Sequence, residues 1–68
     1  MEGRVKSYSS GDLIRILKQH GWFEVACVGS HHQFKHPIRQ GRITVPHPKK
    51  NLPIGTVKNI LRFIGEET

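Results

Sequence analysis

Cysteine is almost absent from this chain of 68 residues, and long apolar runs are missing altogether. The one cysteine, Cys27, excludes an intrachain disulfide and any zinc site built from several cysteines, and it fits a reducing compartment. No apolar run approaches the roughly 20 residues that span a bilayer, and residues 1–6 lack the apolar core of a signal peptide. We therefore expect a cytoplasmic protein with no membrane segment.

Acidic residues are also scarce. Five Asp and Glu stand against eleven Lys and Arg, which gives a formal charge of +6 and an isoelectric point of about 10.1. In so short a chain this balance favours a polyanionic partner, and nucleic acid is the commonest of these. The alternative interpretation of the charge is a soluble protein that happens to be basic and has no polyanionic partner. The length predicts a single domain, residues 1–68, with a modest core.

The order of apolar and turn-forming residues predicts two helices around three strands. A capping box at Ser9-x-x-Asp12 and helical spacing up to Gly21 predict the first helix, after a loose arm at residues 1–7. Strands are expected at residues 22–28, 31–36 and 42–46, separated by turns rich in Gly and Pro. An apolar stripe predicts a second helix that begins near Pro53 and ends at Gly65. The predicted fold is α+β, in the order α-β-β-β-α, with an antiparallel sheet and both helices on one face.

Two helices can cover one face of such a sheet, so the other face is expected to meet solvent. Phe34 is the clear core residue of the second strand, and the strand period of two puts His32 and His36 on its side. The solvent-facing side then carries five polar residues from the second and third strands: His31, Gln33, Lys35, Arg42 and Thr44. An exposed imidazole beside two cations suits work on a phosphodiester.

A metal site is the main alternative for the histidines. His32 and His36 stand four residues apart, which on a strand separates their Cα atoms by about 13 Å, too far for both to bind one zinc ion at about 2.0–2.1 Å. No cysteine cluster is present, and no carboxylate is expected close to these histidines. We therefore expect no metal and no other cofactor.

Several motifs in order resemble one known family. They are Leu17-Lys18-Gln19-His20-Gly21-Trp22, Gly29-Ser30-His31-His32-Gln33-Phe34, His36-Pro37, Thr44-Val45-Pro46-His47-Pro48-Lys49-Lys50 and Leu52-Pro53-x-Gly55-Thr56-Val57-Lys58-Asn59-Ile60-Leu61. From about Ser9 to Gly65 the chain is similar to the HicA toxins, the mRNA interferases of HicAB toxin–antitoxin systems. The resemblance implies a fold like that of double-stranded RNA-binding domains, an mRNA substrate and a HicB antitoxin as partner.

The resemblance also implies a catalytic histidine in the Gly-Ser-His motif, which falls on His31 here. Some family members have this histidine displaced by one position, so His32 is a second candidate, and the expected exposure of His31 favours the first. RNA carries its own nucleophile, the ribose 2′-hydroxyl, so its cleavage needs proton transfer rather than a metal, and an imidazole transfers protons near neutral pH. Residues expected to bind the RNA are Ser30, Lys35, Arg42, Lys49 and Lys50.

Two other functions are alternatives to a ribonuclease. A non-catalytic RNA-binding module of similar fold would use the basic surface alone. A DNA-binding protein is disfavoured, because both helices need their apolar stripes for the core and neither is left to enter a major groove.

Overall fold

The computed structural model describes residues 7–65 and confirms the predicted order of elements. They are α1 (Ser10–Gln19), β1 (Phe23–Val28), β2 (His31–Lys35), β3 (Ile43–Pro46) and α2 (Ile54–Phe63). Each predicted strand is one residue too long at one end, and α2 begins one residue after Pro53. The arm predicted at residues 1–7 lies, except for Ser7, outside the described residues.

Both ends of α1 follow from local sequence. The Ser9 hydroxyl accepts a hydrogen bond from the backbone N–H of Asp12, and the Asp12 carboxylate accepts one from the N–H of Ser9, both at 3.1 Å. This is the predicted capping box. At the other end Gly21 follows the C-cap with φ +91°, in the left-handed region that glycine adopts without strain. A Cβ there would also lie 2.9 Å from Nε2 of His36, so glycine is required for two reasons.

The three strands form an antiparallel sheet in the order β1-β2-β3, with β2 in the middle. Glu24 pairs with Phe34, whereas Ala26 pairs with Gln33, so β1 has a bulge at Val25. A bulge adds an unpaired residue and changes which side chains share a face. The residues of β1 on either side of the bulge therefore do not follow one simple alternation.

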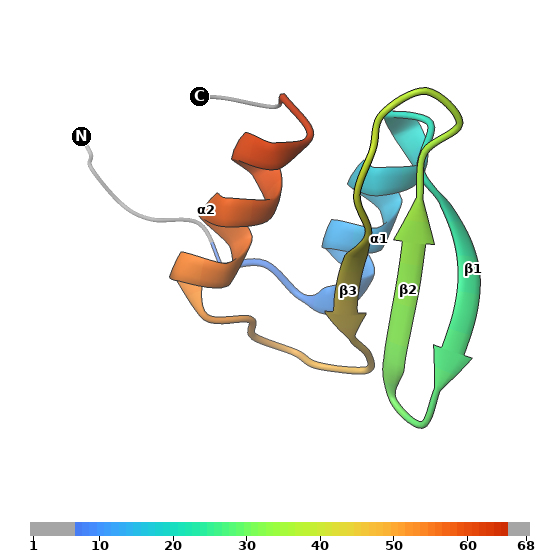
Figure 1. Ribbon diagram of the computed structural model, residues 1–68. Helices are drawn as coiled ribbons and strands as arrows, with labels where there is room; N and C mark the ends of the chain where they lie inside the picture. Colours follow the sequence, from blue (N-terminus) through green and yellow to red (C-terminus); the bar gives the residue numbers. More distant parts are fainter. Residues whose placement is uncertain (1–6, 66–68) are drawn as a thin grey trace.

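One core joins both helices to one face of the sheet. Its buried side chains come from all the main elements except β1: Leu13, Leu17, Trp22, Phe34, Ile43, Val45, Leu52, Val57 and Ile64. In Figure 1, α1 lies behind the sheet and α2 stands beside β3, while β1 forms the edge farthest from α2. The helix-side surface of β1 is consequently left open. No helix of residues 7–65 is long and apolar enough to cross a membrane.

The segment between β2 and β3 is hydrogen-bonded to the C-terminal ends of both helices. The Arg39 guanidinium donates hydrogen bonds to the carbonyl oxygens of Phe63 (2.9 Å) and Ile64 (3.0 Å), where a cation also complements the helix dipole. The His36 ring lies 3.0 Å from the carbonyl oxygen of His20 and packs edge-on against Trp22. His36 and Arg39 thus hold the scaffold together, at the end of the sheet opposite His31.

Candidate active site and histidine cluster

A tight hairpin turn positions the Gly-Ser-His-His motif. Val28 pairs with His31 across β1 and β2, which leaves Gly29 and Ser30 as the two central residues of the turn. Gly29 has φ +60°, and Ser30 is not among the positive-φ residues. Glycine at the first central position is the requirement of a type II′ turn, whose twist matches that of the flanking strands. The turn therefore delivers His31 and His32 as the first two residues of β2, on opposite faces of the sheet.

His31 lies on the face away from the helices and is exposed, as predicted. Within residues 7–65 its side chain makes no hydrogen bond or ion pair. Farther along the same face, the Arg42 guanidinium donates a hydrogen bond to the side-chain oxygen of Gln33. This contact places Arg42, which immediately precedes β3, beside Gln33 of β2. Within residues 7–65 the imidazole of His31 is thus an exposed, unengaged titratable group on that face.

The predicted RNA-binding residues are all exposed but form two groups. Lys35 ends β2, four residues from His31, a Cα separation of about 13 Å. Arg42, which precedes β3, belongs to this distant group. Ser30, Lys49 and Lys50 lie instead at the His31 end, because the N–H of His47 donates a 2.8 Å hydrogen bond to the carbonyl oxygen of Ser30. The cations of the β3–α2 loop, rather than Lys35, are therefore the ones brought toward the motif.

His32 has a different environment on the helix side. Its Nδ1 lies 3.0 Å from Oε2 of Glu24, and its Nε2 lies 3.6 Å from Sγ of Cys27. The ring also meets that of His47 edge-on, with centroids 5.1 Å apart. The His32 side chain is 21% exposed. Both of its ring nitrogens are thus engaged, although the helices do not bury it.

This cluster corrects one expectation from the sequence. We expected no carboxylate near these histidines, yet Glu24 is in hydrogen-bonding contact with His32. The carboxylate reaches it because Glu24 pairs with Phe34 just before the bulge and so faces the helix side together with His32. His32 and His36 stay apart, as their spacing on the strand predicts, since His36 interacts with His20 and Trp22 rather than with His32.

Ser10, a buried polar residue, fixes the loop that follows β3. Its hydroxyl lies 2.6 Å from Nδ1 of His47 and accepts a 2.8 Å hydrogen bond from the N–H of Lys49. Its own N–H donates to the carbonyl oxygen of Lys49 at 2.8 Å. The first residue of α1 therefore sets the path of the loop that carries His47 and the two lysines.

Replacing Ser10 with alanine is expected to destabilise the protein by about 1–3 kcal/mol, because it leaves the partly buried N–H of Lys49 without its acceptor. Chemical denaturation of the variant measures this loss. The matched control is Ser7→Ala, an exposed serine, for which we expect a change within about 0.5 kcal/mol. Equal stabilities of the two variants would contradict the role given to Ser10.

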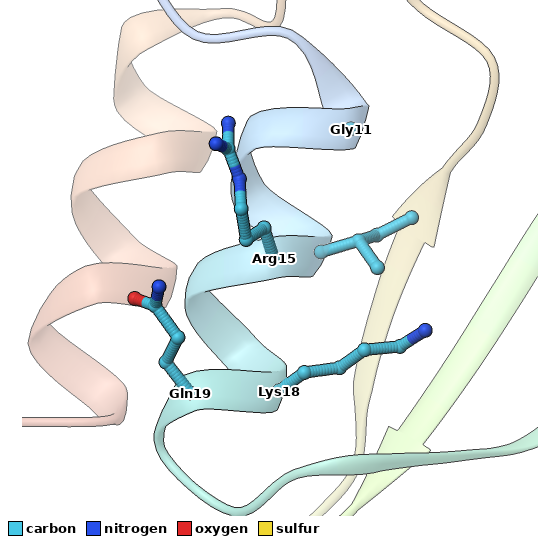
Figure 2. A pocket seen from close by; sticks show the side chains of 5 residues that line it. Gly11, Arg15, Lys18 and Gln19 are labelled. Atoms are coloured by element: carbon cyan, nitrogen blue, oxygen red, sulfur yellow. The ribbon is translucent and has the colours of Figure 1, made fainter.

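A shallow hollow lies elsewhere, on the outer side of α1. It is lined by Gly11, Ile14, Arg15, Lys18 and Gln19. Figure 2 shows Gln19 extending on the side of α2 and Lys18 on the side of β3. Arg15 forms an ion pair with Asp12 at 2.8 Å. None of the motif histidines lines this hollow, so it is separate from the candidate site.

The chain was compared with known protein families and with curated proteins. A family model described as "HicA toxin of bacterial toxin-antitoxin" matches residues 10–65, from the first residue of α1 to the glycine after α2. No curated protein matches the chain. The matched segment contains the complete α-β-β-β-α fold and the Gly-Ser-His-His motif, and the family implies an antitoxin as partner. The chain belongs to the HicA toxin family of bacterial toxin–antitoxin systems.

Proposed function

We propose that this toxin is a metal-independent endoribonuclease that cleaves mRNA in the cytoplasm, with His31 as its catalytic residue. The observation that carries the proposal is the exposed His31 imidazole, which has no partner within residues 7–65, in a chain of the HicA family. A large substrate such as RNA needs a proton-transfer group that it can reach from solvent. His31 meets this requirement because it lies outside the layer that the helices cover.

His32 is the competing assignment, and its contacts speak against it. A general base must have a ring nitrogen available for the substrate proton. In His32, Nδ1 faces the Glu24 carboxylate and Nε2 faces the Cys27 thiol. A carboxylate can orient a catalytic imidazole, but then the second nitrogen should point to open space. The exposed ring of His31 has nitrogens available to the substrate, whereas that of His32 does not.

The reaction is a transesterification within the RNA. The ribose 2′-oxygen attacks the adjacent phosphorus while a base takes the 2′-hydroxyl proton. The bond from phosphorus to the 5′-oxygen breaks, and an acid gives that oxygen a proton. The products are a 2′,3′-cyclic phosphate and a 5′-hydroxyl end. With one catalytic histidine for the two proton transfers, we expect a slow enzyme.

Positive charge positions the RNA and stabilises the pentavalent phosphate. The exposed Lys49 and Lys50 lie in the loop whose residue His47 is hydrogen-bonded to Ser30, at the same end of the sheet as His31. Lys35 and Arg42 extend the same basic surface along the sheet, about 13 Å from His31 in the case of Lys35. We infer that these lysines and Arg42, with Ser30, follow the phosphate backbone, and that a HicB-type antitoxin covers the His31 face.

The test is digestion of a defined single-stranded RNA by the purified toxin in EDTA, followed by analysis of the product ends. We expect cleavage that EDTA does not reduce, with 2′,3′-cyclic phosphate and 5′-hydroxyl ends, and we expect a HicB-type antitoxin to stop it. Intact RNA that is nevertheless bound would favour the alternative function, a non-catalytic RNA-binding module. Cleavage that disappears in EDTA would contradict the metal-independent mechanism.

A further inference from the structure

We propose that Cys27 and His32, with Glu24 behind them, form a zinc-binding site on the helix side of the β1–β2 hairpin. This inference does not depend on the ribonuclease proposal. Glu24, Cys27 and His32 each offer a ligand atom, and these atoms lie within 4.8 Å of one another. Cys27 and His32 are directly paired across the strands, so the backbone itself holds the two side chains together.

The spacing of the two nearest ligand atoms fits a zinc ion. A tetrahedral zinc with nitrogen at about 2.05 Å and sulfur at about 2.3 Å separates these atoms by about 3.6 Å. The structure has Nε2 of His32 and Sγ of Cys27 3.6 Å apart. An ion can therefore bridge them with little movement of either strand.

Glu24 is placed as the carboxylate that a metal-binding histidine commonly has next to its second ring nitrogen. Histidine ligands commonly donate their second ring N–H to a carboxylate, which fixes the tautomer and strengthens the ligand. Here Oε2 of Glu24 lies 3.0 Å from Nδ1 of His32, which leaves Nε2 as the nitrogen that faces Cys27. The Glu24 carboxylate thus lies on one side of the His32 ring, and the proposed metal position lies on the other side, between the ring and the Cys27 sulfur.

The chemistry of the site selects the ion. A thiolate with an imidazole favours zinc over magnesium or calcium, which prefer oxygen ligands. Cys27 and Glu24 are exposed, so water can complete the coordination. The Cys27 thiol, which lies 3.4 Å from the carbonyl oxygen of Gly29, must lose its proton to solvent when the metal binds. The predicted site is open, accessible and pH-dependent.

The experiment is titration of the untagged, reduced full-length toxin with Zn²⁺ by calorimetry, and with Co²⁺ by absorption to detect a bond between cobalt and sulfur. We expect one ion per chain with a thiolate-to-cobalt band. Cys27→Ser and His32→Ala should each lower the affinity at least 100-fold and remove the band. Glu24→Gln should lower the affinity by about 10- to 100-fold, as for other residues that support a metal ligand.

His31→Ala is the matched control, because it removes the neighbouring imidazole from the opposite face of the sheet. We expect it to bind zinc as the wild-type toxin does. No binding by the wild-type toxin, undiminished binding by Cys27→Ser, or equal losses in His31→Ala and His32→Ala would each overturn the proposal. The titration involves no RNA, so its result tests the zinc site whether or not the protein cleaves RNA.

Discussion

Replacing His31 with alanine is expected to slow RNA cleavage by about 100- to 10,000-fold, the usual contribution of one general acid–base group. RNA affinity should change only a few-fold, because the charge that holds the phosphates comes from the lysines and Arg42. The stability of the fold should also be kept, since His31 is exposed and its side chain makes no hydrogen bond or ion pair within residues 7–65. Single-turnover cleavage of a labelled RNA, together with a binding titration, measures both quantities.

Two further histidine variants make this result specific. His20→Ala removes an exposed imidazole at the end of α1, far along the chain from the motif, and should cleave as the wild-type toxin does. His32→Ala removes the competing candidate and should keep most of the activity. If His32→Ala is inactive while His31→Ala cleaves normally, the catalytic imidazole lies on the helix side of the sheet. If both variants cleave normally, the active site lies outside the motif.

The elements of the fold could be predicted because each depends on a local pattern. The capping box at Ser9 and the positive φ of Gly21 fix the ends of α1 with no help from distant residues. In β2 the alternation around Phe34 correctly placed His31 toward solvent, because that strand is regular and central. On β3 the same rule correctly placed Thr44 toward solvent, since Thr44 pairs with Gln33 and is exposed.

The surroundings of His32 could not be predicted in the same way. The bulge at Val25 puts Glu24 and Cys27, three residues apart, on the same face as this ring, and a bulge leaves no clear signal in the alternation of six residues. Two helices with one apolar stripe each are also expected to cover a whole face of the sheet. In the structure β1 contributes no residue to the buried core, so the helix side of the hairpin stays accessible.

Contacts between segments far apart in the sequence also could not be predicted from local patterns. Ser10 and Lys49 are far apart in the sequence, and a serine in the first turn of a helix is usually read as a solvent-facing cap. Only the folded chain shows that its hydroxyl is buried against the loop after β3. That loop brings Lys49 and Lys50 to the His31 end, whereas Lys35 lies at the other end of β2 because the strand is extended.

Phe34→Ala is expected to have the largest effect on stability. Phe34 is 0% exposed and lies on the central strand, within the one core that joins both helices to the sheet. Removing a buried phenylalanine side chain costs about 3–5 kcal/mol, through lost burial and the cavity left behind. A small domain has roughly 5–15 kcal/mol in total, and the melting temperature should fall by at least about 12 °C.

Phe23→Ala gives the matched comparison, because Phe23 belongs to the adjacent strand and is 49% exposed. It pairs with Lys35 at the edge of the sheet, and such a cross-strand contact contributes about 0.2–1 kcal/mol. Thermal melts followed by circular dichroism should therefore separate the two variants clearly. Similar losses in both would mean that the face of the sheet away from the helices, which Phe23 shares with Lys35, is packed as tightly as the core, and would contradict the placement of the core on the helix side.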